Sequence, residues 1–209
     1  MLPPYVNEAL TNFSKPENRA AFDESLHRVK AELGKTYPLV INGEVISTKE
    51  TFASVNPSRP AEAVGHFAQG TREHVDQAVA SAARAFESWR KVPVGERARY
   101  LLKAAAEMRR RKHEFSAVMV LEAGKPWNAA DADTSEAIDF LEYYARQAVR
   151  IADSSAQMAE FPDEQLGFYY IPLGVGVIIP PWNFPNAIPA GMVASTLVTG
   201  NTAVFKPAE

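Results

Sequence analysis

The sequence contains no cysteine, and it also lacks the patterns that would define a metal-dependent or hydrolytic site. Without cysteine the chain can form neither a disulfide nor a thiolate metal site. No P-loop and no Ser–His–Asp arrangement is visible. The histidines have none of the spacings typical of metal ligands; they are His27, His66, His74 and His113.

The chain also has no large excess of one sign of charge and no long apolar run. The formal net charge is −3 for 209 residues, so we expect no nucleic-acid or membrane partner. The longest apolar stretch is far shorter than a membrane span, and the opening MLPPYVNEAL lacks the regions of a secretory signal. With 46% hydrophobic and 22% charged residues, the composition is that of an ordinary globular chain. We therefore expect a cytoplasmic protein.

The most informative stretch is residues 174–209, GVGVIIPPWNFPNAIPAGMVASTLVTGNTAVFKPAE. Its apolar run from Val175 to Ile179 is β-branched, as in a buried parallel strand. A helix of small and apolar residues is expected from about Ala187 to Val198, and a second strand over Ala203–Phe205. A strand, a helix and a strand in this length predict a βαβ unit with a right-handed crossover.

Two polar clusters fall at the carboxyl ends of these two strands. Asn183 follows the first strand, between aromatic residues and prolines that should hold its backbone rigid. Lys206 and Glu209 follow the second strand. Ligands of open α/β sheets bind at the carboxyl ends of the strands. We therefore expect both clusters to belong to a ligand site.

The motif PWNFP, followed by a small-residue helix and then FKPAE, resembles the aldehyde dehydrogenase superfamily. The resemblance implies that the Asn183 amide donates a hydrogen bond to the oxyanion of a thiohemiacetal. It also implies that Lys206 and Glu209 hold the adenosine ribose of a nicotinamide cofactor. A carboxylate that accepts from the ribose 2′-hydroxyl would repel a 2′-phosphate, which favours NAD over NADP. Three further residues are implied to bind this cofactor: Ile179, Pro181 and Trp182.

Within this resemblance the missing cysteine becomes important. Aldehyde dehydrogenases use a cysteine nucleophile, and in that family the general-base glutamate and the nicotinamide loop follow the FKPAE motif. The sequence ends at Glu209, directly after this motif. We therefore expect the chain to be the amino-terminal portion of a longer enzyme and to be inactive alone, because the catalytic domain is absent from it.

Four other segments indicate a particular family within this superfamily: the NGE hairpin, RRRKHEFSA, EAGKPW and EAIDFLEYYAR. They are similar to the 1-pyrroline-5-carboxylate dehydrogenases, a family that oxidises glutamate 5-semialdehyde in proline degradation. This similarity implies that Glu136 meets the substrate ammonium and that Phe184 packs on the aliphatic part of the substrate. From the residues alone, Glu136 is also explained as one of several acids that favour a helix amino terminus; the others are Asp131, Asp133 and Asp139.

Local signals predict most of the remaining elements. Ser14 to Glu17 is a capping box that begins a helix reaching about Leu33. Asn42-Gly43 predicts a hairpin with a type I′ turn, and an exposed strand is expected over Gln165–Ile171. Short strands are also expected over Phe52–Val55 and Ala63–Phe67, and helices over 71–91, 93–112, 114–122 and 129–152. The buried face of the 71–91 helix is predicted to contain Val75, Val79, Ala82, Ala83, Phe86 and Trp89.

The expected fold is α/β, with an incomplete Rossmann-like parallel sheet that has helices on both faces. We assign residues 1–36 to an amino-terminal arm, residues 37–152 and 173–209 to a truncated NAD-binding domain, and residues 153–172 to an oligomerisation hairpin. The complete enzyme is expected to be a homo-oligomer that acts on a small semialdehyde. Two alternatives stay open at this point: a dehydrogenase of another semialdehyde, and a non-catalytic chain that serves as a binding or interaction module.

Overall fold

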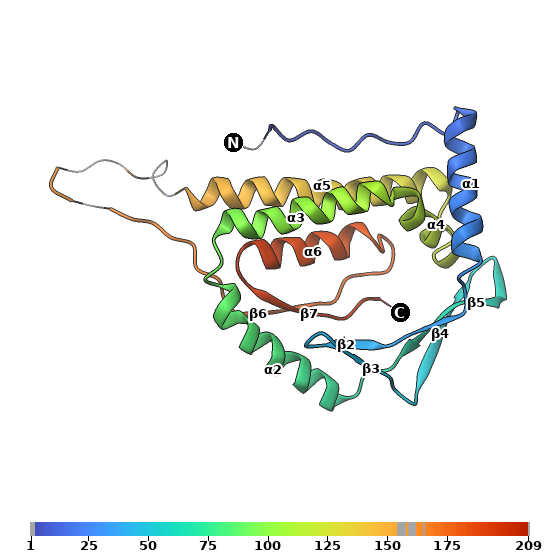
Figure 1. The fold of residues 1–209 in the computed structure, drawn as a ribbon, viewed down its shortest axis with the longest axis horizontal. Coiled ribbons are helices and arrows are strands. Elements are labelled where there is room, and N and C mark those ends of the chain that lie inside the picture. Colours follow the sequence, from blue (N-terminus) through green and yellow to red (C-terminus); the bar gives the residue numbers. More distant parts are fainter. Residues whose placement is uncertain (1–2, 154–157, 159–161, 165, 209) are drawn as a thin grey trace.

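The computed structural model describes residues 3–153, 158, 162–164 and 166–208 (Figure 1). The helices are α1 (Pro16–Lys30), α2 (Arg72–Trp89), α3 (Val94–Arg110), α4 (Lys112–Glu122), α5 (Trp127–Ala152) and α6 (Ala187–Val198). The strands are β1 (Lys35–Tyr37), β2 (Leu39–Ile41), β3 (Glu44–Ile46), β4 (Thr51–Asn56), β5 (Arg59–Ala68), β6 (Val175–Ile178) and β7 (Thr202–Phe205).

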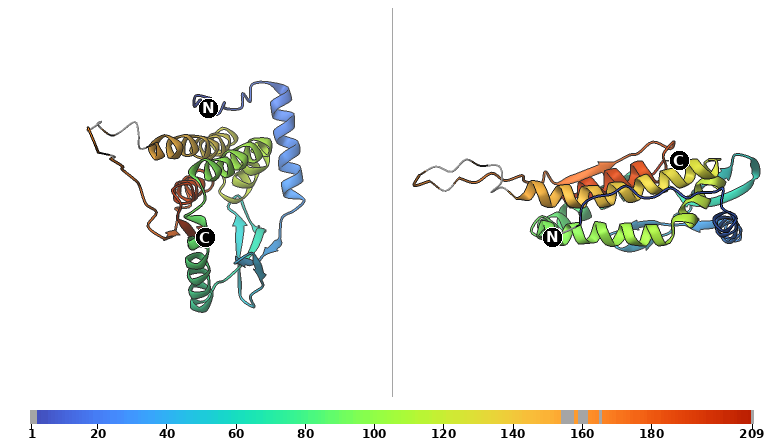
Figure 2. Two further views of the ribbon diagram at one scale, coloured as in Figure 1. Left: turned by 60° about the vertical axis from the view of Figure 1, so that its left-hand side comes forward. Right: turned by 90° about the horizontal axis from the view of Figure 1, so that it is seen from above.

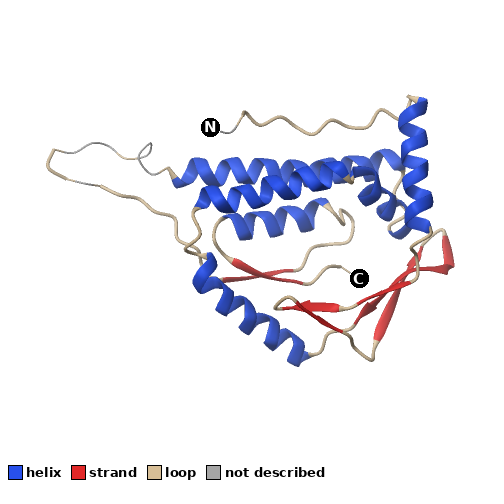
Figure 3. Cartoon of the chain, in the orientation of Figure 1, coloured by secondary structure: helices blue, strands red, loops and turns tan. Residues whose placement is uncertain are grey.

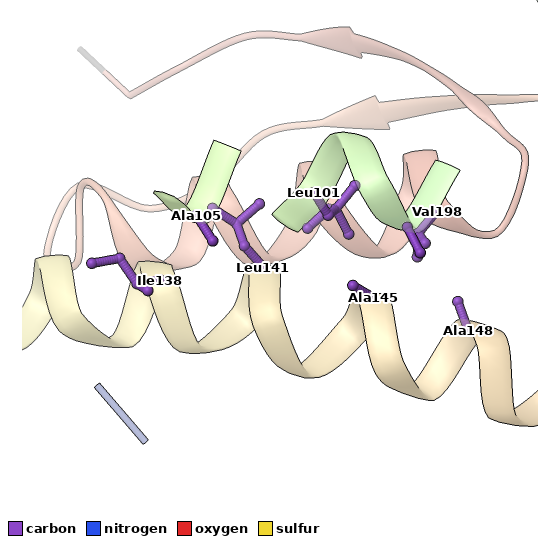
Figure 4. Close-up of a cluster of buried hydrophobic side chains, with 9 residues drawn as sticks. Leu101, Ala105, Ile138, Leu141, Ala145, Ala148 and Val198 are labelled. Atoms are coloured by element: carbon purple, nitrogen blue, oxygen red, sulfur yellow. The ribbon is translucent and has the colours of Figure 1, made fainter. Parts of the chain in front are cut away.

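The hydrophobic core lies where α3, α5 and α6 pack together. Small side chains at the contact let the helix axes approach closely. Gly191 of α6 shows this directly, because a Cβ atom added there would lie 3.0 Å from the ring of Phe140 on α5. One stripe of α5 is buried, and Figure 4 shows it against α3 and α6; the cluster contains Ala98, Leu101, Ala105, Ile138, Leu141, Ala145, Ala148, Ala194 and Val198.

Strands β6 and β7 are parallel and are joined through α6, which confirms the predicted βαβ unit. Helices cover both faces of this pair. Gly176 of β6 faces α6, since a Cβ atom added there would lie 3.0 Å from the side chain of Thr196. Thr202 of β7 faces α2, where its hydroxyl donates to the Ala82 carbonyl at 2.8 Å. The pair is therefore a small Rossmann-like sheet between two helices, as Figure 1 shows.

The other strands form two separate small sheets. Strands β2 and β3 pair antiparallel as the predicted hairpin, with φ of 55° at Asn42 and 77° at Gly43. These positive φ angles are those that a type I′ turn requires. The second sheet has the order β1-β5-β4, in which β1 and β5 are parallel and β4 and β5 are antiparallel.

Two predictions about helices were wrong. The capping box at Ser14 does not form: the cap residue of α1 is Lys15, which makes no side-chain cap bond to the described residues. The Ser14 hydroxyl instead donates to the Asn12 side chain at 2.7 Å, a local bond of the kind that competes with capping.

The predicted buried face of α2 is also wrong in part, because Val75 and Val79 are 54% and 39% exposed. Ala83 of the predicted buried face is exposed as well, and the buried residues of α2 are Ser81 and Ala82.

The predicted strand at Gln165–Ile171 also differs from the structure. Gln165 lies outside the described residues, and residues 166–171 are not assigned to a strand. They run outside the helical body (Figure 2), and Tyr169 and Ile171 are more than three-quarters exposed, at 77% and 78%. An oligomerisation role for residues 153–172 stays a prediction, as do the other proposed domain boundaries.

The arm before α1 lies along α5 as an extended segment without regular secondary structure (Figure 3). Its backbone and side chains donate to two acids of α5. Asp131 accepts from the Thr11 amide at 2.8 Å and from the Thr11 hydroxyl at 2.6 Å. Asp139 accepts from the Glu8 amide at 2.7 Å and from Asn7 at 2.9 Å. These acids therefore anchor the arm, which is a role beyond the helix-dipole explanation.

His113 gives the packing of α1 on α4 a predicted pH dependence. Its ring centroid lies 5.6 Å from that of Phe22, and its Nδ1 is buried with no hydrogen-bond partner among the described residues. Burial lowers the pKa of His113 below 6.5, Asp131 opposes this change and Lys112 adds to it. The unfolded chain then binds more protons, so the stability contributed by neutral His113 is present above pH 6.5 and decreases as pH falls below that value.

We therefore expect the free energy of unfolding to fall between about pH 8 and about pH 5.5, and to fall less in His113→Leu. Urea unfolding at several pH values measures this difference. His27→Gln is the control because His27 is an exposed histidine on α1. If the His113→Leu curve ran parallel to that of the unsubstituted protein, His113 would not be the titrating group.

Candidate active site

The carboxyl ends of β6 and β7 meet at one edge of the sheet. Ile178 pairs with Phe205 in register, and the Lys206 amide donates to the Ile178 carbonyl at 2.9 Å. Ile179 follows at once and is 63% exposed, which leaves an apolar side chain at the strand end. The structure therefore places Ile179 and Lys206 side by side, where a ligand of a parallel sheet would bind.

The turn between β6 and α6 lies at this same edge. Pro180 is buried, whereas Pro181 and Asn183 are exposed. The two aromatic side chains of the turn are also accessible, with Trp182 73% and Phe184 41% exposed. The Asn183 amide is thus presented on the surface by a turn with an aromatic residue on each side.

Two residues of the predicted site are not among those described at this edge. Glu209 lies outside the described residues. Glu136 is exposed on α5, three residues after Asp133, so it lies about one helical turn further along the same side of the helix. A separate cleft lies beside α1 and is lined by Phe13, Arg19 and Trp127, among others. None of the residues predicted for the site lines this cleft.

A buried ion pair between Lys125 and Asp133 contacts this turn and the start of α6. It was not predicted from the sequence. The Asp133 side chain is 0% exposed and accepts from Lys125 Nζ at 2.5 Å. Its other oxygen accepts from the amide of Ala187, the first residue of α6, at 2.7 Å. Lys125 Nζ also lies 4.4 Å from the centroid of the Phe184 ring. From the sequence, the dipole of its own helix explains Asp133, whereas in the structure Asp133 contacts the amino end of a different helix.

This arrangement can donate hydrogen bonds and bind an extended ligand, but it holds no nucleophile of the expected kind. The chain has no cysteine. Among the residues that the structure describes, no three histidine or carboxylate side chains are placed to hold a metal ion. Within the same residues, no helix is long and apolar enough to cross a membrane.

Comparison with known proteins defines the class to which this fold and this edge belong. A model of the aldehyde dehydrogenase family matches residues 45–209, and the chain belongs to that family. Among its relatives are the 1-pyrroline-5-carboxylate dehydrogenase of Geobacillus sp. (strain WCH70) and 1-pyrroline-5-carboxylate dehydrogenase 2 of Bacillus subtilis (strain 168). They are 52% and 51% identical to it over 208 residues. These matches cover 100% of this chain and 40% of each relative.

Solved structures give the same result. The 1-pyrroline-5-carboxylate dehydrogenase from Thermus with bound NAD superposes with a TM-score of 0.95 at 46% identity, over 99% of this chain and 40% of that one. The Mycobacterium tuberculosis enzyme bound with NAD gives a TM-score of 0.87 at 27% identity, over 99% of this chain and 39% of that one. The expected fold class is confirmed, and the chain spans about two fifths of the length of these proteins.

Proposed function

We propose that this chain is the cofactor-binding part of an NAD-dependent dehydrogenase that oxidises L-glutamate 5-semialdehyde, formed from 1-pyrroline-5-carboxylate, to L-glutamate. The observation that carries the proposal is the likeness of the whole chain to 1-pyrroline-5-carboxylate dehydrogenases, one of them solved with NAD. The complete enzyme is proposed to be a cytoplasmic homo-oligomer that catalyses this step of proline degradation. By full-length enzyme we mean this chain joined to the region that its relatives carry beyond the matched part.

The edge of the β6–β7 pair fits the proposed cofactor. Exposed Ile179 offers an apolar surface for a flat base, beside Lys206, which can donate to ribose hydroxyls. Glu209 is proposed to accept from the 2′-hydroxyl, and Pro181 and Trp182 to contact the cofactor from the turn. NAD, when bound, accepts the hydride that the aldehyde carbon loses.

In the proposed reaction, Asn183 acts on the aldehyde oxygen. A cysteine thiolate from the region beyond this chain adds to the carbonyl carbon, and the oxygen becomes an oxyanion. The exposed Asn183 amide donates a hydrogen bond to that oxyanion, which stabilises charge as it develops. Hydride loss then gives a thioester, and a water deprotonated by a glutamate of that same region hydrolyses it to the carboxylic acid and the free thiol.

Substrate choice is proposed to involve two residues of this chain. Phe184 is 41% exposed and can pack on the aliphatic part of the semialdehyde. Exposed Glu136 can pair with the α-ammonium group, since a carboxylate and an ammonium make a charge-assisted hydrogen bond. A longer or uncharged aldehyde would lack one of these two contacts.

A test of the proposal compares two proteins: this chain alone, and the full-length enzyme built by joining it to the remaining region of the Geobacillus relative. With glutamate 5-semialdehyde, the full-length enzyme should form NADH and should form NADPH much more slowly. The chain alone should form neither, because it has no cysteine. Turnover by the pure chain would contradict the proposed division of the chemistry. Preference of the full-length enzyme for another aldehyde would contradict the substrate.

A further inference from the structure

The contacts behind the Trp182–Pro185 turn join three parts of the chain that are distant in sequence. Lys125 comes from the connection between α4 and α5, Asp133 from the first turns of α5, and Ala187 from the start of α6. Asp133 contacts both of the others, at 2.5 Å to Lys125 Nζ and 2.7 Å to the Ala187 amide. Lys125 then reaches the turn itself through the Phe184 ring.

Asp133 acts as the cap of a helix other than its own. The cap residue of α6 is Asn186, which makes no side-chain cap bond to the described residues. The first amide of α6 would be unsatisfied without the Asp133 carboxylate, which also places negative charge at the positive end of the helix dipole. This contact fixes where α6 begins, and therefore where the turn before it ends.

Lys125 contacts the turn at Phe184, the residue next to Asn183 in the chain. Its side chain is only 16% exposed, and its ammonium group, held by Asp133, lies over the face of the Phe184 ring. The Phe184 carbonyl also accepts from the Ile188 amide at 3.3 Å, which ties the same residue to the first turn of α6. Phe184 is held through both its ring and its backbone, and Asn183 is its direct neighbour in the chain.

A buried ion pair is an expensive way to gain stability. The cost of removing both charges from water is often as large as the attraction between them, so an apolar pair of similar size would serve as well. What an ion pair adds is direction, because it requires particular atoms to lie in particular places. This pair directs the start of α6 and the ring of Phe184.

We propose that Lys125 and Asp133 are positioning residues that hold the Trp182–Pro185 turn so that the Asn183 amide points at the reacting oxygen. This inference rests on the role proposed above for Asn183. Neither residue needs to touch the substrate or the cofactor. Displacing an aligned group by about 1 Å can lower a rate by about a hundredfold, so the fixed turn matters for turnover more than for cofactor affinity.

The experiment is a double-mutant cycle on kcat in the full-length enzyme. Lys125→Met should lower kcat by about 10- to 100-fold and leave the dissociation constant of NAD within about twofold. In the Asn183→Ala background the same change should lower kcat by less than about twofold, because the group that Lys125 positions is already absent. Lys125→Arg, which keeps the positive charge, should recover part of the loss. Lys103→Met, which removes an exposed lysine of α3, is the matched control and should leave kcat unchanged.

The outcomes separate this inference from the proposed function. Losses that multiply in the double mutant, or a Lys125→Met enzyme that behaves like Lys103→Met, would overturn the positioning role. Loss of NAD binding together with kcat would also overturn it, since that pattern indicates general unfolding. If the unsubstituted enzyme preferred a different aldehyde, the substrate assignment would fail, and the cycle would be scored with that aldehyde.

Discussion

Replacing Asn183 with alanine should lower the turnover of the full-length enzyme by about 10²- to 10³-fold while the affinity for NAD changes by only a few-fold. The side-chain amide is proposed to act on an oxyanion that exists only after the nucleophile has added. Removing it therefore raises the barrier and leaves the bound ground state almost unchanged. The exposure of Asn183 at the carboxyl end of β6 is the structural basis of this expectation.

Steady-state kinetics with a range of aldehyde concentrations would measure the effect, together with an NAD titration. Asn186→Ala is a matched control: Asn186 directly follows the Trp182–Pro185 turn, but its amide is directed at the Met108 sulfur at 3.9 Å. Its loss should affect kcat far less than the loss of Asn183. A mutant Asn183→Ala with near-normal kcat would refute the proposed oxyanion contact.

The second large effect is expected on stability, at Asp131. This carboxylate is 1% exposed and accepts from Lys112 Nζ at 3.0 Å as well as from Thr11. In Asp131→Ala, Lys112 would stay buried, and among the described residues it would keep only the Ala9 carbonyl at 2.8 Å as a partner. Removing one partner of a buried ion pair typically costs about 3–5 kcal/mol, because the remaining charge is left without compensation. We expect a loss of free energy of unfolding in this range, measured by urea denaturation.

Asp139→Ala provides the comparison for Asp131→Ala. Asp139 also accepts two hydrogen bonds from the arm, but it is only partly buried, and no buried lysine of the described residues pairs with it. Its loss should cost about 1–3 kcal/mol, the range for an unsatisfied hydrogen-bonding group. Equal effects of the two substitutions would show that the arm contacts, and not the ion pair with Lys112, dominate at Asp131.

The elements that could be predicted from the sequence have signals close together in the chain. Asn42-Gly43 specifies its own turn, because both residues must adopt positive φ angles that few others tolerate. The apolar spacing of α5 defines the side that packs in the core. The βαβ unit could be predicted because its apolar runs, small-residue helix and prolines all lie within residues 174–209.

The features that could not be predicted depend on residues far apart in sequence. Asp133 and the Ala187 amide are 54 positions apart, and no periodicity relates them. An acid near a helix amino terminus already has a sufficient local explanation, which concealed its contact with another helix. The burial of α2 could not be read from its apolar face either, because Val75 and Val79 of that face are exposed whereas Ser81 is buried. Glu209 keeps its predicted role without a structural description.

The arm along α5 has a consequence for the order in which the protein folds. Its contacts connect residues 103 positions apart at Lys112 and Ala9, and 143 positions apart at Arg146 and Pro3. Joining such distant segments has a high entropic cost before any bond forms, so contacts of high sequence separation form slowly. The arm needs α5 as a finished surface. During synthesis the ribosome makes the arm before it makes α5, and we infer that the arm reaches its native place only after α5 has formed.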